Sequence, residues 1–404
     1  MTEAASVNAA PPTPVPYPFT GSHGLDVHEA YAAAREADGM IRVQLPYGEP
    51  AWLATRYEDV RFVMGDARFS RAMSVQPGEP RYTPAVSETT IISFDAPEHT
   101  RLRTPVVRAF SRLRVEDMRP WVRKVADELL DAMIAGGDRG DLVGGFALPL
   151  PIAILCELLG VPDADRPQFR EWSDAALSTS PLPAEEREQR IMALYGYLAA
   201  RVAAARGAEE PQQHDLLSAL VAAQDPEDEL SEQELTELVL GIVFSGYETT
   251  ASMFPDCVHV LLGHPDEWAA LVADPELIPT AVEELVRFVP MGIGGAFPRY
   301  AKEDVEVGGV LVRAGEPVLP VIYAANRDAG QFPEPDAIRL DRSANQHLSF
   351  GHGAHYCLGS RLARVELQEA LHALVTKMPE LKAVEDIQWK ESVIRSPERM
   401  VVSW

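Results

Sequence analysis

Apolar side chains recur at intervals of three and four residues through the middle and later parts of the chain. This spacing places them on one face of an α-helix, and it therefore predicts helices. The predicted helices cover residues 115–134, 185–206, 231–262, 278–289 and 360–376. Since strand signals are few, the pattern predicts a mostly α-helical protein with small sheets.

The helix at 231–262 has the clearest start signal. Ser231 is followed three residues later by Glu234, the spacing of a capping box. Residues 238–244 are apolar all round, which indicates a helix that crosses the core. Pro255 lies inside the same pattern and predicts a kink or an early end there.

Three segments have strand character. Residues 305–312 predict a hairpin around Gly308 and Gly309, residues 317–325 form an apolar run with β-branched side chains, and residues 393–404 alternate in part.

The start of the chain differs from the rest. Residues 1–18 are rich in Ala and Pro, which predicts a flexible, extended arm. Because no long polar linker follows, residues 19–404 are expected to form one domain, and a monomer is expected.

Charge and cysteine content exclude several classes of function. The chain has 36 Lys and Arg against 61 Asp and Glu, a formal net charge of -25, so nucleic acid and anionic membrane surfaces are poor partners. Three cysteines without a Cys-x-x-Cys pair favour neither a disulfide framework nor a zinc site. No signal peptide or spanning segment is found, and a soluble, cytoplasmic protein is expected.

The strongest local signal is the segment 349–359, which comes directly before the predicted helix 360–376. Cys357 lies there among glycines, and the loop amides and the helix dipole favour its thiolate. Gly353 and Gly359 allow the backbone to pass close to something flat or bulky. For an arbitrary cysteine, a buried structural role would be the commoner interpretation.

The pattern Phe-x-x-Gly-x-x-x-Cys-x-Gly in this segment resembles the haem-ligand loop of the cytochrome P450 family. Its fixed positions are filled by Phe350, Gly353, Cys357 and Gly359. The resemblance extends over residues 19–404 and is to the soluble bacterial branch. It implies the mainly α P450 fold, a helical bundle around haem b, with Cys357 as the iron ligand. Phe350, Gly351 and Gly359 then belong to the cofactor-binding loop, and the thiolate favours O–O cleavage.

A second motif is the run 245–250 in the centre of the long helix. Thr249 could simply bond back to the carbonyl four residues earlier. The run also resembles the family's small-Gly-x-acid-Thr motif, which implies that Gly246 leaves room for dioxygen, that Thr249 supplies a proton and that Glu248 relays protons from solvent. Ser245 and Tyr247 depart from the family's usual residues, and Tyr247 is expected to add a polar contact above the ring.

A third motif is Glu284 with Arg287, an i, i+3 pair that resembles the family's buried Glu-x-x-Arg. The third member is usually an arginine, but Ala337 stands where it is expected. Either Arg339 or Arg342 takes its place, and the sequence does not choose between them.

The resemblance also implies cations that hold the haem propionates. His99 and Arg103 are four residues apart on one predicted helix, and Arg299 and His355 match the other positions where relatives bind these carboxylates.

The expected function is that of a haem-thiolate monooxygenase, which inserts one oxygen atom of O2 into a lipophilic substrate by hydroxylation or epoxidation. A polyketide macrolide, a terpenoid or a steroid is expected, and the bias towards Arg over Lys favours an actinomycete-like host. The expected substrate-lining residues are mainly apolar: Ile91, Ile92, Leu240, Val243, Phe244, Tyr247, Met291, Ile293 and Ile394.

Electrons are expected from an acidic ferredoxin with its NAD(P)H-dependent reductase. The expected docking patch is a basic region of an acidic chain, formed by Arg101, Arg103, Arg108, Arg112, Arg114, Arg361 and Arg364.

Two alternatives stay open. The enzyme could couple or desaturate its substrate, or the chain could be a haem-binding sensor without turnover. A peroxide-driven enzyme is disfavoured by Glu248 and Thr249, since such enzymes usually lack the acid–alcohol pair.

Overall fold

The computed structural model describes residues 12–19, 24–37, 39–84, 90–112, 115–177, 180–208, 215–224, 229–292, 297–390, 392 and 394–404. Helices dominate this part of the chain, as expected. None of its helices combines the length and apolar character needed to cross a membrane. The α-helices are α1 Ala30–Glu36, α2 Tyr57–Gly65, α3 Glu98–Arg112, α4 Arg119–Ala135, α5 Pro149–Leu158, α6 Arg166–Asp174, α7 Ala184–Gly207, α8 Leu216–Ala222, α9 Glu232–Leu262, α10 Pro265–Ala273, α11 Ile278–Phe288, α12 Ile322–Ala325 and α13 Ser360–Lys377.

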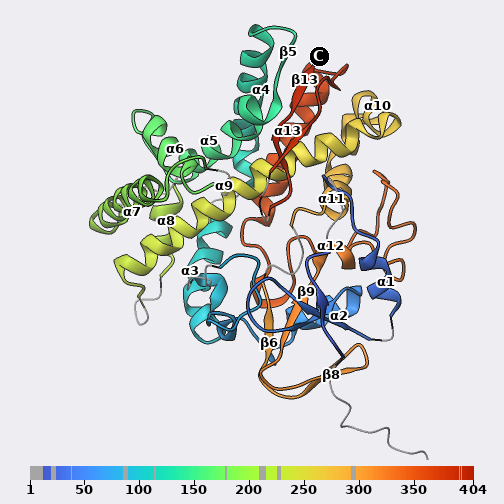
Figure 1. Cartoon of the computed structure of the whole chain (residues 1–404). Coiled ribbons are helices and arrows are strands. Elements are labelled where there is room, and N and C mark those ends of the chain that lie inside the picture. The colour runs from blue at the N-terminus through green and yellow to red at the C-terminus, as the bar shows by residue number, and fades with distance from the viewer. Residues whose placement is uncertain are drawn as a thin grey trace, which may run out of the picture.

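The long helix α9 organises the molecule. It crosses the middle of the fold, with α4, α5 and α6 above it and α2 and the main sheet below it in the view of Figure 1. The capping box is present, because the Ser231 hydroxyl accepts a hydrogen bond from the Glu234 amide and the Glu234 carboxylate accepts one from the Ser231 amide. The expected early end at Pro255 is wrong: α9 continues to Leu262.

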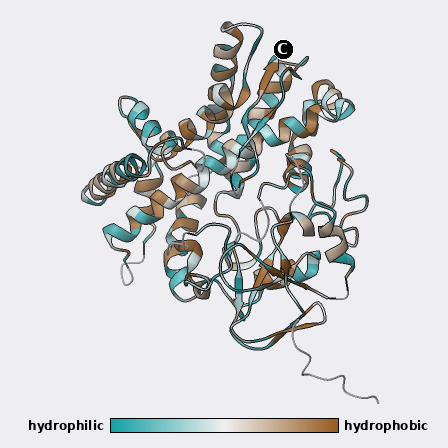
Figure 2. Ribbon diagram, viewed as in Figure 1, coloured by the Kyte–Doolittle hydropathy of each residue, from teal (hydrophilic) through white to brown (hydrophobic). Residues whose placement is uncertain are grey.

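The main sheet has six strands in the order β1-β2-β3-β9-β6-β4. In β3, Trp52 and Ala54 pack into one apolar cluster and Ala51 and Leu53 into another. Successive side chains of a strand point to opposite faces, so this sheet is covered on both sides. Figure 2 shows its strands in brown, whereas teal and brown alternate along the surface helix α7. The strands are β1 Val15–Pro16, β2 Ile41–Gln44, β3 Ala51–Ala54, β4 Phe69–Ser70, β6 Arg299–Ala301 and β9 Pro317–Pro320.

The remaining strands form small sheets. A three-stranded sheet, β10-β13-β5, joins Lys382–Ala383, Val401–Ser403 and Arg139–Asp141, and a pair joins β11 Gln388–Trp389 to β12 Pro397–Arg399.

The predicted hairpin is confirmed as β7 Val305–Val307 and β8 Val310–Val312. Gly308 and Gly309 have φ of 54° and 82°. Two successive residues with positive φ are what a tight two-residue hairpin turn requires, and glycine adopts them without strain.

Two other expectations differ from the structure. The apolar run 317–325 is only partly strand, since β9 ends at Pro320 and α12 follows. Near the N-terminus, β1 pairs in parallel with β2 and Tyr17 is buried, so the expected arm boundary at residue 18 falls inside the folded region. Residues 1–11 lie outside the described part of the chain.

Candidate active site

The loop around Cys357 is held by its own backbone. The Cys357 amide donates to the Phe350 carbonyl (2.8 Å) and the Gly351 amide to the Leu348 carbonyl (2.7 Å). A turn of 3₁₀-helix, Gly353–His355, lies between them, and α13 begins three residues after Cys357. Gly351 and Gly353 have φ of 79° and 71°. Glycine at these positions therefore lets the chain fold back to present the cysteine.

Gly353 has a second reason to be glycine. A Cβ there would lie 2.7 Å from the Cα of Gly65, at the end of α2. The loop and α2 thus pack backbone to backbone, which explains one glycine of the sequence motif through protein packing rather than through a ligand.

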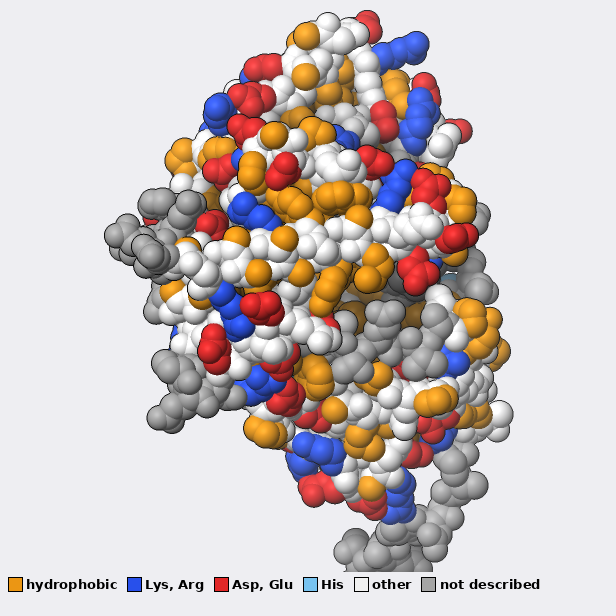
Figure 3. Space-filling view, turned by 90° about the vertical axis from the view of Figure 1, so that its left-hand side faces the viewer, with side chains coloured by type: hydrophobic (Ala, Val, Ile, Leu, Met, Phe, Trp, Pro, Cys, Tyr) orange, Lys and Arg blue, Asp and Glu red, His pale blue; other side chains and the backbone are white. Residues whose placement is uncertain are grey.

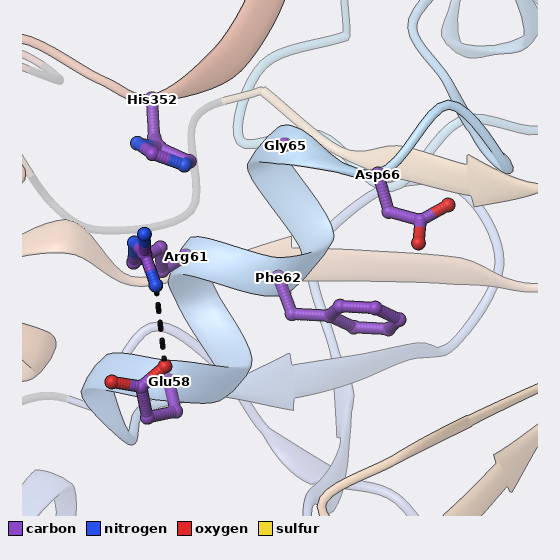
Figure 4. A pocket seen from close by; sticks show the side chains of 6 residues that line it. All are labelled: Glu58, Arg61, Phe62, Gly65, Asp66 and His352. Atoms are coloured by element: carbon purple, nitrogen blue, oxygen red, sulfur yellow. Dashed lines mark ion pairs between the residues drawn. The ribbon is translucent and has the colours of Figure 1, made fainter.

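A pocket of about 320 Å³ opens beside this contact. Figure 4 shows His352 of the loop above Arg61, which pairs with Glu58 on α2. Its lining is largely charged, so it does not offer the apolar slot that a flat macrocycle needs. The lining residues are Glu58, Arg61, Phe62, Gly65, Asp66 and His352.

The Cys357 thiol has different surroundings from the thiols of the other two cysteines, Cys156 and Cys257. Desolvation raises its pKa, but hydrogen bonds from the amides of Gly359 and Ser360 and the charges of Arg103 and Arg364 act in the opposite direction. Its side chain is nevertheless exposed. It is therefore an accessible sulfur with donors and cations around it.

The other cysteines have no such surroundings. Burial raises the pKa of Cys156 to about 12 and that of Cys257 well above its usual value, and both side chains are buried. Such thiols are inert.

The four expected propionate partners gather around Cys357. The rings of His99 and His355 lie 4.1 Å apart. Desolvation, together with His99 and Arg299, lowers the pKa of His355 to about 3. Arg103, one helical turn after His99, donates to the Tyr356 carbonyl next to the cysteine.

Arg299 and Arg71 add two arginines to this group of donors. Arg299 is 5% exposed, and desolvation together with Arg71 lowers its pKa to about 9. Arg71 is also buried, where it donates to the Ser74 hydroxyl and the Pro298 carbonyl. The sequence analysis missed Arg71, because it follows a short strand and belongs to no recognisable motif.

The donors of this group are only partly matched by acceptors. The Nε2 atom of His99 is buried, and no described residue is hydrogen-bonded to it. The Asp95 carboxylate is engaged by the Ser70 hydroxyl and the Arg71 amide, and the charges of Glu79 and Asp95 act on the Arg71 guanidinium. A buried donor without an acceptor is costly, so a ligand with carboxylates fits here. A haem, with a soft thiolate for its iron and cations for its two propionates, matches this donor set.

The central segment of α9 has one accessible face. Ser245 is exposed although it lies in the middle of a core helix, and Thr249, one turn further on, is partly exposed. The Thr249 hydroxyl donates to the Ser245 carbonyl, which is the back-bonding that the sequence left open. Its oxygen can still accept a hydrogen bond. Glu248 is largely buried, and its carboxylate lies 3.9 Å from the ammonium group of Lys390.

Two expected lining residues are on the wrong face of α9. Val243 and Tyr247 are 0% and 2% exposed, and the Tyr247 hydroxyl donates to the Asp174 carboxylate on α6. They are one turn apart, so they share the face that packs into the core. The expected polar contact of Tyr247 above the ring is therefore corrected to a bond between helices.

The other expected lining residues are accessible to different degrees. Ile92 is exposed, and Ile293 lies outside the described residues. The rest are partly buried apolar side chains: Ile91, Leu240, Phe244, Met291 and Ile394.

The Glu284–Arg287 pair is fully buried, with two contacts of 2.8 Å between guanidinium and carboxylate. The third member is Arg342, whose Nε lies 3.0 and 3.1 Å from the Glu284 oxygens. Arg339 contributes its backbone amide only, while its side chain pairs with exposed carboxylates.

The expected basic patch is smaller than the sequence suggested. Arg101 pairs with Glu98 and Glu234, and Arg364 pairs with Glu283 and covers the Phe350 ring at 4.3 Å. Arg114 and the side chain of Arg112 lie outside the described residues. The patch therefore retains the exposed Arg108 and Arg361, neither of which forms an ion pair within the part that the structure describes. Figure 3 shows acidic and basic side chains interspersed on one face of the molecule.

Comparison with known proteins agrees with this geometry. A sequence model of the family described as Cytochrome P450 matches residues 163–403. The chain is 48% identical to mycinamicin IV hydroxylase/epoxidase of Micromonospora griseorubida over 97% of its length and 99% of the relative's. It is 47% identical to nocardicin C N-oxygenase of Nocardia uniformis subsp. tsuyamanensis, over 96% and 98% of the two chains. A solved structure of a mutant of the mixed-function P450 MycG in complex with mycinamicin IV has a TM-score of 0.93 at 48% identity, over 97% of this chain and 100% of that one.

Proposed function

The chain belongs to the cytochrome P450 family, and we propose that it hydroxylates or epoxidises a large lipophilic secondary metabolite of the macrolide type. It is a haem-thiolate monooxygenase by family. The observation that carries the proposal is the accessible Cys357 sulfur beside a buried group of donors, in which the Nε2 atom of His99 has no hydrogen-bond partner among the described residues.

When bound, a haem would supply the chemistry of O2 activation and oxygen insertion. Cys357 is proposed as its protein ligand, and His99, Arg299 and His355 as the partners of its carboxylates. The Glu248 carboxylate and the Thr249 hydroxyl, adjacent on α9, are proposed to hold and move protons between solvent and the accessible face of the helix.

The ligand assignment is tested by the reduced carbon monoxide spectrum. Cys357→His is expected to abolish the red-shifted Soret band that thiolate ligation produces, because imidazole donates less electron density to iron. The matched control is Cys156→Ser, which changes a buried, inert thiol and is expected to keep the band. Survival of the band in Cys357→His would show that another residue binds the iron.

The substrate class has two supports. The accessible apolar side chains from four separate segments, among them Phe244 and Met291, suit a large lipophilic molecule. The relative at 48% identity is named for oxidation of mycinamicin IV. The relative at 47% identity is named for N-oxygenation of nocardicin C, so identity alone does not determine the substrate.

Binding spectra decide between the substrate classes. A panel of macrolides, terpenoids and steroids is added to the ferric protein, and displacement of water from the iron is followed as a type I shift. Macrolides are expected to bind most tightly, that is, to give the type I shift at the lowest concentration. The product is expected to contain one additional oxygen atom. A product that has lost two hydrogens or has been dimerised indicates desaturation or coupling instead. Binding without any NAD(P)H-dependent product indicates a sensor.

An acidic ferredoxin, reduced by an NAD(P)H-dependent reductase, is the proposed electron donor, and the cytoplasm is the proposed location because these donors are found there. The surface of this chain on which the ferredoxin docks is proposed to include the exposed Arg108 and Arg361. The rate of reduction is then expected to fall with ionic strength, over a Debye length of about 10 Å at 0.1 M. Charge reversal at either arginine should slow reduction and leave substrate affinity unchanged. Indifference to both salt and charge reversal would place docking elsewhere.

A further inference from the structure

A lysine far away in sequence reaches the proposed proton-relay segment. Lys390 follows β11, and its backbone amide donates to the Ser396 carbonyl (3.0 Å). Its side chain is only 5% exposed, and its Nζ lies 3.0 Å from the Ser252 hydroxyl and 3.9 Å from the Glu248 carboxylate. The C-terminal strand pair thus places a buried cation beside the acid on α9.

A second acid lies on the same stripe of the helix. Glu248, Ser252 and Asp256 are spaced by four residues, so they share one face of α9. Asp256 is 0% exposed, and within the described residues neither carboxylate oxygen has a hydrogen-bond partner of good geometry. The Ser396 hydroxyl donates to the Ser252 carbonyl and also lies close enough to Asp256 to act against the rise in the pKa of its carboxyl.

One ammonium group faces two acids in a largely dry environment. Burial raises the pKa of Asp256 well above its usual value, although Lys390 and Arg395 act against this. Burial also lowers the pKa of Lys390, while Glu248, Asp256 and Glu398 of β12 act to raise it. An isolated charge at the fully buried Asp256 would be costly, so the ammonium group is matched better by Glu248, which lies closer to solvent and within ion-pair distance.

We propose that Lys390 is a positioning residue for Glu248: its ammonium group, held by the Ser252 hydroxyl, orients the Glu248 carboxylate next to Thr249. The inference rests on the proposed role of Glu248 in proton transfer and adds the group that controls that acid. The competing interpretation is that Lys390 only fastens the C-terminal strands to α9 through Ser252.

The first measurement is coupling, meaning product formed per NAD(P)H consumed. In Lys390→Met the Glu248 carboxylate loses the cation that orients it, so coupling is expected to fall by about tenfold or more while substrate affinity stays unchanged. Lys390→Arg keeps the charge and is expected to restore wild-type coupling.

The matched control is Arg399→Met. Arg399 lies in the same strand pair, but its ion pair with Glu385 is exposed, so its loss should not change coupling. The reduced carbon monoxide spectrum verifies that each variant holds its haem. If Lys390→Met does not fold, Lys390→Gln, which retains a donor for Ser252, takes its place with the same expectation.

The second measurement does not use turnover. Unfolding constants are compared for the wild type, Lys390→Met, Glu248→Gln and the double variant. Each single variant raises the unfolding constant by some factor. If Lys390 and Glu248 form a pair, the factor for the double variant is expected to be about fivefold or more smaller than the product of the two single factors. A purely structural bond from Lys390 to Ser252 predicts simple multiplication.

The outcomes separate this inference from the function on which it rests. If Glu248→Gln couples like the wild type, the proton role of Glu248 is wrong, whatever Lys390 does. If Glu248→Gln uncouples turnover, but Lys390→Met keeps wild-type coupling and the unfolding effects multiply, the positioning role of Lys390 is overturned.

Discussion

Two buried charge networks in this molecule are built in opposite ways. Around Glu284, the charged groups are densely hydrogen-bonded: Arg287 donates to the carboxylate and to the Asn326 and Pro335 carbonyls, and Arg342 and Asn345 donate to the same carboxylate. This network joins α11 to the segment that leads into the cysteine loop.

Around Lys390 the contacts are sparse. The lysine has one hydrogen bond to Ser252 and a longer contact with Glu248, and neither carboxylate oxygen of the buried Asp256 has a hydrogen-bond partner of good geometry among the described residues. A densely hydrogen-bonded network fixes a structure, whereas a sparse one leaves a group free to change its protonation state. The comparison therefore predicts that damage to the first network mainly affects stability, and damage to the α9 region mainly affects turnover.

The largest effect is expected from Glu284→Gln. Arg287 and Arg342 would remain buried without a carboxylate, and breaking a buried pair in this way costs about 3–5 kcal/mol of unfolding free energy. Denaturant unfolding measures the loss, and haem retention is expected to fall with it. A loss below 1 kcal/mol would show that the network is not a structural support.

Thr249→Ala is expected to affect turnover rather than stability. Its hydroxyl bonds only to a carbonyl of its own helix, so stability should change little. Removing a positioned proton donor costs about a hundredfold in the productive step, and the electrons are expected to appear as hydrogen peroxide. Product and peroxide formed per NAD(P)H measure this, with Thr250→Ala as the neighbouring control. Equal uncoupling in both variants would assign the effect to the helix rather than to one hydroxyl.

A smaller effect with a distinctive pH dependence is expected from Asp256→Asn. The folded-state pKa of Asp256 is raised by burial. Above the unfolded value of about 3.9, the folded state therefore holds a proton that the unfolded state has released, and wild-type stability falls as pH rises. Asparagine does not titrate. The unfolding free energy of the variant, relative to the wild type, should therefore rise by up to about 1.4 kcal/mol for each pH unit above about 3.9.

Denaturant unfolding of both proteins at about pH 4 and pH 7 measures this gain. The control is Asp163→Asn, a side chain that is 94% exposed and should show no pH-dependent difference. A constant difference between Asp256→Asn and the wild type at both pH values contradicts a neutral Asp256.

The sequence was most informative where a regular element determines the geometry. Ser231 and Glu234 correctly marked the start of α9, and the Gly308-Gly309 pair marked a hairpin. Helical spacing also shows why Val243 and Tyr247 do not line the accessible side of α9. Accessible Ser245 and Thr249 are four residues apart, so residues 243 and 247 lie on another face.

Contacts between distant segments were out of reach. Lys390 and Glu248 are 142 residues apart in the numbering and belong to no common motif. Arg71 is buried near Arg299 through strand pairing of β4 with β6, which short polar segments do not signal. Periodicity records which face a residue occupies, but not which distant element covers that face.

The choice between Arg339 and Arg342 gives the smallest predicted effect. Both lie in an irregular segment, where spacing does not determine the direction of a side chain. Arg339 gives Glu284 its backbone amide at 3.0 Å, which any residue except proline supplies. Its guanidinium is 43% exposed and faces Glu334 and Asp341, which are 72% and 74% exposed.

Arg339→Met is therefore expected to lower the unfolding free energy by only about 0–1 kcal/mol, the range of surface ion pairs. Arg342→Met removes a buried partner of Glu284 and should cost several times more. Denaturant unfolding of the two variants side by side measures the difference. Equal losses would mean that the buried carboxylate depends on the whole segment 339–342 rather than on the guanidinium of Arg342.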